Sequence, residues 1–275
     1  MRRPLVLAAA ATLLCAGCST ADAGNRDKPA AASSSPSSGS SSASASASGS
    51  AVRAAVAALR EDTAGFRQKI ELEGDGRVYG LTITGDFDFA ADNGHLAVDL
   101  PGGAIDHSDQ IFADGKIYIS GVQGIGEGTW GVVPRDEAQA HYLLRAPLND
   151  PEHVLRQIAA MRKISREGTE NVQGVRAVRY RGILDHRTAT LRMATAVRTR
   201  MDQARDALGS DVPVFADAWV DGRGRLVQIR MNVNMSGARV TLTMALSDIG
   251  KPVRVRVPPA SDTVPVTEVG GILNG

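Results

Sequence analysis

Apolar and polar residues alternate with a period of two along much of this chain. In residues 79–89, Tyr79, Leu81, Ile83, Phe87 and Phe89 fall on one face and four polar residues on the other. Successive side chains of a strand point to opposite faces, so this run predicts a long strand with one dry and one wet face. Similar runs predict further strands at 95–100, 111–113, 116–120, 164–169, 175–184, 214–221, 227–235, 239–246 and 254–257.

Turn residues separate several of these runs. Asp114-Gly115 lies between two apolar-rich runs and is a strong signal for a two-residue hairpin turn. Residues 171–174 and Asp221–Gly224 mark two further turns. The strands therefore cluster and pair as hairpins.

Three segments have helical spacing instead. From 51 to about 67, Val52, Val56, Leu59 and Phe66 share a stripe. A second helix starts with Asp150 as its cap and Pro151 as its first residue. A third is predicted over 188–208 and ended by Gly209. Its apolar face consists of Leu191, Ala194, Val197, Met201 and Leu208.

The order of these elements predicts an α+β domain over residues 51–260. Paired hairpins indicate an antiparallel sheet, with the helices on one side of it. Pro258-Pro259 should end the fold, and residues 261–275 are expected to form a loose tail.

The N-terminus has the features of a lipoprotein export signal. Arg2 and Arg3 precede an apolar run, 5–16, that is too short for a membrane span of roughly 20 residues. Small residues then lead to Cys18, as in a lipobox, although Cys15 stands where that motif usually has Leu. We predict a signal peptide over 1–17 and a diacylglycerol on Cys18. The alternative is an ordinary cleaved signal with an incidental cysteine.

Residues 18–50 are predicted to be a disordered tether. They are rich in Ser and Ala and carry no large apolar side chain to bury, so ordering them would cost entropy without return. The tether would hold the domain outside the cytoplasmic membrane, at its outer face.

Charge balance and cysteine content exclude some classes of binding partner and site. The chain carries 31 Lys+Arg and 30 Asp+Glu, and loss of residues 1–17 would remove two arginines and no acid. Such a balance gives no electrostatic basis for nucleic-acid binding. Only Cys15 and Cys18 are present, so the mature domain has no disulfide, cysteine-zinc site or cysteine nucleophile. We expect a monomer.

Several short motifs place this pattern among known proteins. They are the lipobox at Cys18, Trp130 after the second hairpin, the Asp150-Pro151 helix start, Gly174-Val175 leading into Tyr180-Arg181-Gly182, Trp219-Val220-Asp221, and Asp248–Val253. Over residues 51–260 the chain resembles the LppX/LprAFG envelope lipoproteins and the wider LolA-like carriers. That resemblance implies a curved antiparallel half-barrel with helices across its concave face. It also implies an apolar cavity for acyl chains and a role in moving lipids or lipoglycans across the envelope.

The candidate lipid-contacting residues lie on the apolar faces of the predicted strands. Aromatic residues make up only 4% of the chain, and adaptable methionines recur on the C-terminal strands. A plain solid core is the alternative. The candidates are Leu81, Ile83, Phe87, Leu96, Val98, Ile117, Ile229, Met231, Val233, Met235, Leu242 and Met244.

The sequence contains only weak signals for a catalytic, phosphate-binding or metal-binding site. Gly121–Gly128 is Gly-rich but has no lysine and no clear following helix, so we expect a loop rather than a phosphate site. Asp106–Asp109 could suggest a metal or acid–base site, yet alternate residues of a strand face opposite ways, and a surface patch fits better. His186 follows Asp185, which we expect to cap a helix. We predict no catalytic residue, metal or cofactor.

The sequence thus predicts a lipid or lipoglycan carrier, served by an envelope transporter. The alternative is a sensory or scaffolding lipoprotein that uses the same fold to bind an envelope protein.

Overall fold

The computed structural model describes residues 39–102, 106–235 and 237–266. One twelve-stranded sheet forms most of this part of the chain. Its strands are β1 (Thr63–Gly74), β2 (Arg77–Asp88), β3 (Asn93–Asp99), β4 (His107–Ala113), β5 (Lys116–Ser120), β6 (Trp130–Pro134), β7 (Arg162–Val172), β8 (Val175–Leu184), β9 (Val214–Asp221), β10 (Leu226–Met235), β11 (Ala238–Ser247) and β12 (Thr263–Pro265). The helices are α1 (Gly39–Arg60), α2 (Pro151–Ala159), α3 (His186–Ala189) and α4 (Thr195–Leu208), with 3₁₀ turns η1 (Pro147–Asn149) and η2 (Ala260–Asp262).

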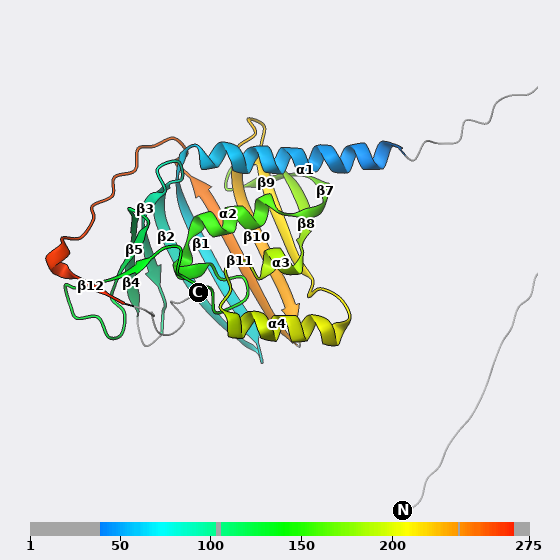
Figure 1. The fold of residues 1–275 in the computed structure, drawn as a ribbon. Helices are drawn as coiled ribbons and strands as arrows, with labels where there is room; N and C mark the ends of the chain where they lie inside the picture. The colour runs from blue at the N-terminus through cyan, green and yellow to red at the C-terminus, as the bar shows by residue number, and fades with distance from the viewer. Residues whose placement is uncertain (1–38, 103–105, 236, 267–275) are drawn as a thin grey trace, which may run out of the picture. The chain divides into compact units, whose positions relative to one another are not determined.

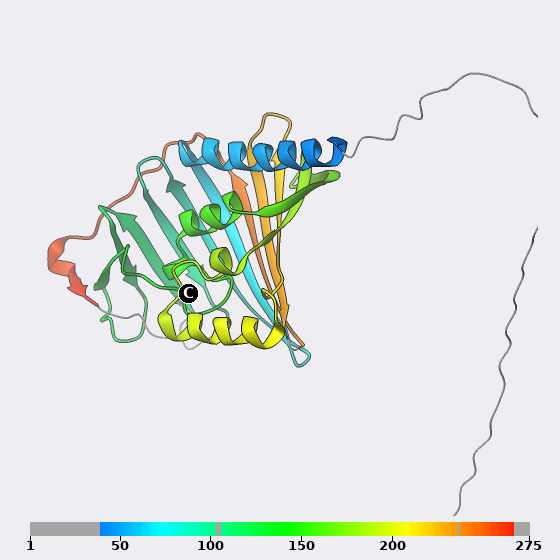
Figure 2. The same ribbon diagram turned by 45° about the vertical axis from the view of Figure 1, so that its right-hand side comes forward.

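The sheet consists of two meanders joined along one seam. Its strand order is β12-β6-β5-β4-β3-β2-β1-β11-β10-β9-β8-β7, antiparallel except where β12 pairs with β6. The seam is the pairing of β1 with β11, in register so that Lys69 faces Thr243. The sheet is open and strongly curved, with the helices on its concave side (Figures 1 and 2). This confirms the predicted α+β class and curved antiparallel sheet.

Local sequence explains the hairpins. Asp114 and Gly115 have φ values of 52° and 69°, and Gln173 and Gly174 have 54° and 79°. Two successive positive φ angles make the tight turn that matches the twist of paired strands. These two predicted hairpins are therefore confirmed, and so is the predicted turn at Asp221–Gly224, which joins β9 to β10. Asp75-Gly76 makes a further hairpin, between β1 and β2, with φ values of 51° and 71°.

Two glycines allow β2 and β3 to approach closely. A Cβ added at Gly85 would lie 2.3 Å from the carbonyl oxygen of His95. One added at Gly94 would lie 2.3 Å from the ring of Phe87. Glycine inside a strand is typical of a tight bend or a close backbone approach. These positions let the sheet curve where any larger residue would clash.

Between β6 and β7 the chain must return from one end of the sheet to the other. Residues 135–161 make this return across the concave face, through η1 and α2 (Figure 1). Asp150 caps α2 as predicted, because its carboxylate accepts a hydrogen bond from the Glu152 amide at 3.0 Å. Val154, Leu155 and Ile158 of α2 are fully buried against the inward side chains of the strands.

The first helix begins at Gly39, twelve residues before its predicted start at residue 51. Residues 39–50, predicted as part of a disordered tether, are therefore helical. α1 starts at Gly39, and Ser48 and Gly49 are buried on the same stripe as Val52 and Val56. Alanine is the best helix former, and extending an existing helix costs little free energy. The helix that forms in the packed half of α1 therefore extends through the Ser/Ala half. The predicted signal peptide, Cys18 and the first part of the tether lie outside the described residues.

The same helix ends earlier than predicted. α1 stops at Arg60, and Phe66 lies on β1 instead of on the helical stripe. β1 was missed because its inward face mixes Phe66 and Ile70 with Gln68, while its outward face is charged. The two neighbours β2 and β11 provide hydrogen-bond partners on both sides of this segment, and tertiary pairing overrides its weak pattern.

The third predicted helix is split. α3 and α4 are separated by residues 190–194, where Arg192 has a φ of 52°. Here the Ala140 amide donates to the Arg192 carbonyl at 2.9 Å, and the Ala194 amide donates to the Ala140 carbonyl at 2.8 Å. The returning segment thus supplies backbone partners that compete with the helix, and Leu208 is left exposed.

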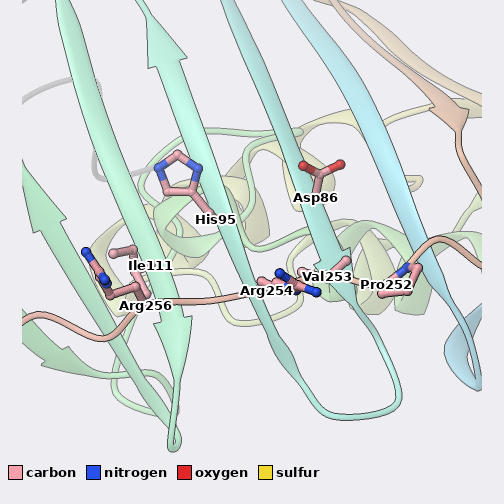
Figure 3. Close-up of a pocket in the computed structure, with 7 residues that line it drawn as sticks. All are labelled: Asp86, His95, Ile111, Pro252, Val253, Arg254 and Arg256. Carbon is pink, nitrogen blue, oxygen red and sulfur yellow. The ribbon is translucent and has the colours of Figure 1, made fainter.

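The C-terminal end also differs from prediction. Residues 254–257 form no strand, because the segment crosses the outer face of the sheet instead of lying beside a strand (Figure 3). Val255 packs there on Ile111, Ala113 and Tyr118. Beyond Pro259, the predicted loose tail contains β12, which pairs with β6 and covers its edge.

Because the Ser/Ala half of α1 packs, its removal should destabilise the domain. Deleting residues 39–50 is expected to lower the melting temperature by several degrees, which corresponds to about 1–2 kcal/mol for a domain of this size. Deleting residues 27–38, an equally long polar stretch, should leave it unchanged. Thermal unfolding followed by circular dichroism measures both. Equal melting temperatures for the two deletions would show that the buried Ser48 contributes nothing.

Candidate functional site

The predicted lipid-contacting residues share one face of the sheet. Eleven of the twelve are buried on the concave side in a single apolar core, and Met235 packs at its margin. The sequence alternation therefore assigned the inner face correctly. It did not separate the residues that line a cavity from those that are packed solid.

An apolar cavity of about 430 Å³ opens at one end of this face. β1, β2 and β11 contribute Ile70, Leu81 and Val240 to it, and the returning segment contributes Tyr142, Leu143 and Arg145. Its mouth is formed by side chains that are unusually exposed for their size, since Val78 is 64% and Tyr79 54% accessible. The volume lies within the ~300–1,000 Å³ typical of small-molecule sites.

Of the twelve predicted residues, only Leu81 lines this cavity. The physical reason is that α2 and the returning segment fill the middle of the concave face with Leu144, Leu148 and Leu155, all buried. The other predicted positions lie in the packed core or at its margin, and their contact with lipid stays a prediction. They are Ile83, Phe87, Leu96, Val98, Ile117, Ile229, Met231, Val233, Met235, Leu242 and Met244.

A buried ion pair fixes the returning segment. The Arg135 guanidinium donates to both oxygens of Asp150, at 2.9 and 2.7 Å, and Arg192 approaches the same carboxylate at 3.5 Å. Arg135 also stacks near Phe87 and Phe112, with its guanidinium carbon 5.4 and 5.1 Å from the ring centroids. Burial opposes the charge of Arg135, but the hydrogen bonds of Asp150 outweigh it, and the pKa of Arg135 is raised.

Other polar side chains of the segment are buried too. Glu152 pairs with Arg60 of α1 at 2.6 Å and with Arg156 at 3.1 Å, which ties α1 to α2. Burial lowers the pKa of His153 to about 4, so this imidazole is neutral at neutral pH. These residues carry structural charges and hydrogen bonds away from the cavity lining.

The outer face carries a second hollow, of about 280 Å³. Asp86 and His95 project from β2 and β3, and Arg254 and Arg256 come from the segment that crosses in front of them (Figure 3). Its lining is mostly charged. It is a cleft between the sheet and the C-terminal segment, and its apolar part, formed by Ile111, Pro252 and Val253, is much smaller than that of the concave-face cavity.

The Asp106–Asp109 motif lies on this outer surface as well. His107 pairs with Asp99 at 2.7 Å, and this hydrogen bond raises its pKa despite partial burial. Ser108 points the other way and is fully buried, as strand alternation predicts. Among the described residues, no group of three or more potential ligands is arranged to hold a metal ion. Asp185 caps α3 by accepting from the Thr188 amide at 2.9 Å, as expected.

Sequence reasoning missed Arg145, Asn149, Gln110 and Gln68, the buried polar residues nearest to or behind the cavity. Arg145 and Asn149 lie in irregular backbone, where no periodicity marks a direction. Gln110 does occupy an inward position of β4, between Ser108 and Phe112. A polar residue at an inward position was the available signal for it.

No protein-family profile matches the sequence, and no curated protein sequence matches it significantly. Solved structures do. LppX from Mycobacterium tuberculosis is 12% identical, with 77% of this chain and 99% of that chain covered and a TM-score of 0.50. LprF from Mycobacterium bovis is 12% identical, with 78% and 97% covered and a TM-score of 0.47. A LolA-superfamily protein from Nitrosomonas europaea is 10% identical, with 77% and 94% covered and a TM-score of 0.32.

The chain therefore has the fold of LppX, an open curved sheet with helices across its concave face. This agrees with the fold that the resemblance in the sequence implied.

Mutation of Asp150 tests whether the Arg135–Asp150 pair stabilises the segment that lines the cavity. Asp150→Asn keeps an oxygen for the α2 cap but removes the only carboxylate that Arg135 meets among buried described residues. The variant leaves the buried Arg135 charge with only the exposed Asp92 as a partner, so we expect a loss of about 3 kcal/mol, at the lower end of the range for a broken buried pair. Chemical denaturation measures it.

Asp185→Asn is the matched control. Asp185 also caps a helix and meets an arginine, but that arginine, Arg162, is 68% exposed. Its loss should cost about 1 kcal/mol or less. Similar losses for the two variants would contradict a special role for the Asp150 pair.

Proposed function

We propose that this protein is a lipid-anchored extracytoplasmic lipoprotein that binds an acyl lipid or lipoglycan in its apolar cavity and carries it through the cell envelope. The supporting observation is the half-open apolar cavity between β1, β2, β11 and residues 142–145. Burial of an acyl chain there yields about 0.8 kcal/mol per CH₂, which offsets its removal from a membrane. Transfer by partition needs no covalent step.

The open end of the cavity fits such a role. Leu72, Val78 and Tyr79 are 43–64% exposed at its mouth, and large apolar side chains are usually covered. An apolar rim allows an acyl chain to enter without crossing a polar barrier. Transfer to or from an envelope transporter would take place at this rim.

The anchor is the second part of the proposal. Cys18 would carry the acyl groups, and the residues between it and α1 would set the distance to the membrane. No helix within the described part of the chain is both long and apolar enough to cross a bilayer.

Cys18→Ser tests the anchor. The variant should be exported but not acylated, because serine has no thiol to accept the diacylglycerol, and it should move from the membrane fraction to the medium. Fractionation with immunoblotting measures this. A variant retained in membranes as firmly as the parent would refute lipidation at this residue.

The cavity is tested by blocking it. Val240 lines the cavity and is not fully buried, so Val240→Trp should fill the space with little loss of stability and reduce co-purifying lipid severalfold. Met231→Trp is the control, because Met231 is fully buried in packed core and the larger ring should cost about 1–3 kcal/mol. Native mass spectrometry of the full chain gives the bound lipid, and denaturation gives stability.

Two results would count against the carrier. One is a parent chain that contains no lipid and takes up none from vesicles. The other is lipid binding that Val240→Trp leaves intact. The first result would favour the alternative, a sensory or scaffolding lipoprotein that binds an envelope protein.

A further inference from the structure

One buried arginine beside the cavity has no acidic partner in the part of the chain that the structure describes. Arg145 is 5% exposed and contributes to the cavity lining. Its Nη2 donates to Asn149 Oδ1 at 2.9 Å, while its Nε has no hydrogen-bond partner in residues 39–102, 106–235 and 237–266. Within the described residues, no carboxylate forms an ion pair with it. The contrast with Arg135 is direct, since that equally buried arginine pairs with Asp150 and Asp92.

An unpaired buried cation is unfavourable, so its retention calls for a reason. Charge taken from water without a partner costs far more than an apolar group of the same size would. Burial lowers the pKa of Arg145 to about 10, which leaves the side chain protonated at neutral pH. The cavity therefore has apolar walls and one fixed positive charge.

The surroundings hold this charge in place. Gln110 Oε1 accepts from Asn149 Nδ2 at 3.2 Å, and Asn149 in turn accepts from Arg145. All three side chains are buried. Leu144, Leu148 and Asn149 have φ values of 61°, 44° and 62°, an unusual backbone for residues other than glycine. This irregular backbone sets the inward direction of the Arg145 side chain. In a regular helix the helical period would set that direction instead.

Position within the cavity sets the direction of a ligand. Arg145 lies at the buried end, whereas Val78, Tyr79 and Tyr142 form the exposed end. An acidic group on Arg145 would therefore lie deep, with an apolar chain leading out toward the mouth. A large sugar headgroup could not occupy the deep end of a cavity of about 430 Å³ and leave room for the chain.

We infer that the cavity selects an anionic single-chain amphiphile, whose carboxylate or phosphate binds Arg145 and whose alkyl chain fills the apolar walls. This inference rests on the proposed lipid-binding function and specifies its ligand. Arginine matches both oxyanions because its planar fork donates two parallel hydrogen bonds. Nε is enclosed and Nη2 donates to Asn149, so Nη1 is the donor available to the ligand.

The test compares three ligands of equal chain length on the full chain with Cys18→Ser, so that no acyl group of its own competes. The ligands are tetradecanoate, tetradecyl phosphate and uncharged tetradecanol. The parent should bind at least one anion tenfold or more tightly than the alcohol, because hydrogen bonds to charged groups are the stronger ones. Calorimetric titration at neutral pH measures the three affinities. The preferred anion distinguishes a fatty acid from a phospholipid-derived source.

Variants then assign the preference to Arg145. Arg145→Gln should bind tetradecanol like the parent but lose the tenfold preference, and Arg145→Lys should keep part of it. Arg239→Gln is the control, because Arg239 is an exposed cation next to the lining residue Val240 and pairs with Glu73. It should behave like the parent.

Each outcome decides between the two proposals. Equal affinities for anion and alcohol in the parent would overturn the anionic ligand while leaving lipid binding intact. Failure to bind any of the three would overturn the proposed function as well. A preference that survives in Arg145→Gln would remove Arg145 from the site. Should Arg145→Gln fail to fold, the parent comparison and Arg145→Lys still decide.

Discussion

The return of the chain from β6 to β7 is the constraint on which the rest of this structure depends. The two strands lie at opposite ends of the sheet, so some 25 residues must cross the concave face and bury their backbone and polar groups there. A buried loop is tolerated only if those groups find partners. Asp150 supplies several of them at once, because it caps α2 and neutralises Arg135 while Arg192 approaches. The helix start, the break between α3 and α4, and the contact of α1 with α2 all follow from this crossing.

The same crossing decides where the molecule is solid and where it is hollow. α2 and its flanking leucines occupy the middle of the concave face, so the strands beneath them form an ordinary packed core. Toward residues 142–145 the segment stands over the ends of β1 and β2 without filling the space between. The cavity is thus the part of the concave face that the returning segment does not cover. Its single charge belongs to that segment and not to the sheet, so the walls and the polar contact come from different parts of the chain.

Much of the sheet could be predicted from the sequence, because apolar and polar residues alternate along each strand that buries only one face. Leu81, Ile83 and Phe87 predicted β2, and Asp114-Gly115 predicted the hairpin of β4 and β5. β1 could not be found in this way, since Gln68 interrupts its inner face and its pairing depends on β11, about 170 residues away. Arg145 could not be found either. Its role depends on which residues surround it, and a sequence pattern reports only which residues precede and follow it.

The pairing of β1 with β11 also has a consequence for the order of folding. The strands β1–β6 and β7–β11 pair mostly through local hairpins, which form quickly, and β8 and β9 are joined through α3 and α4. The seam between them joins residues near 69 to residues near 243, so its loop-closure entropy must be overcome in full before any seam contact forms. Until that step, β1 and β11 are both free sheet edges, and free edges are sites of aggregation. Because the chain is synthesised from its N-terminus, the edge of β1 stays exposed until β11, near the C-terminus, has been made.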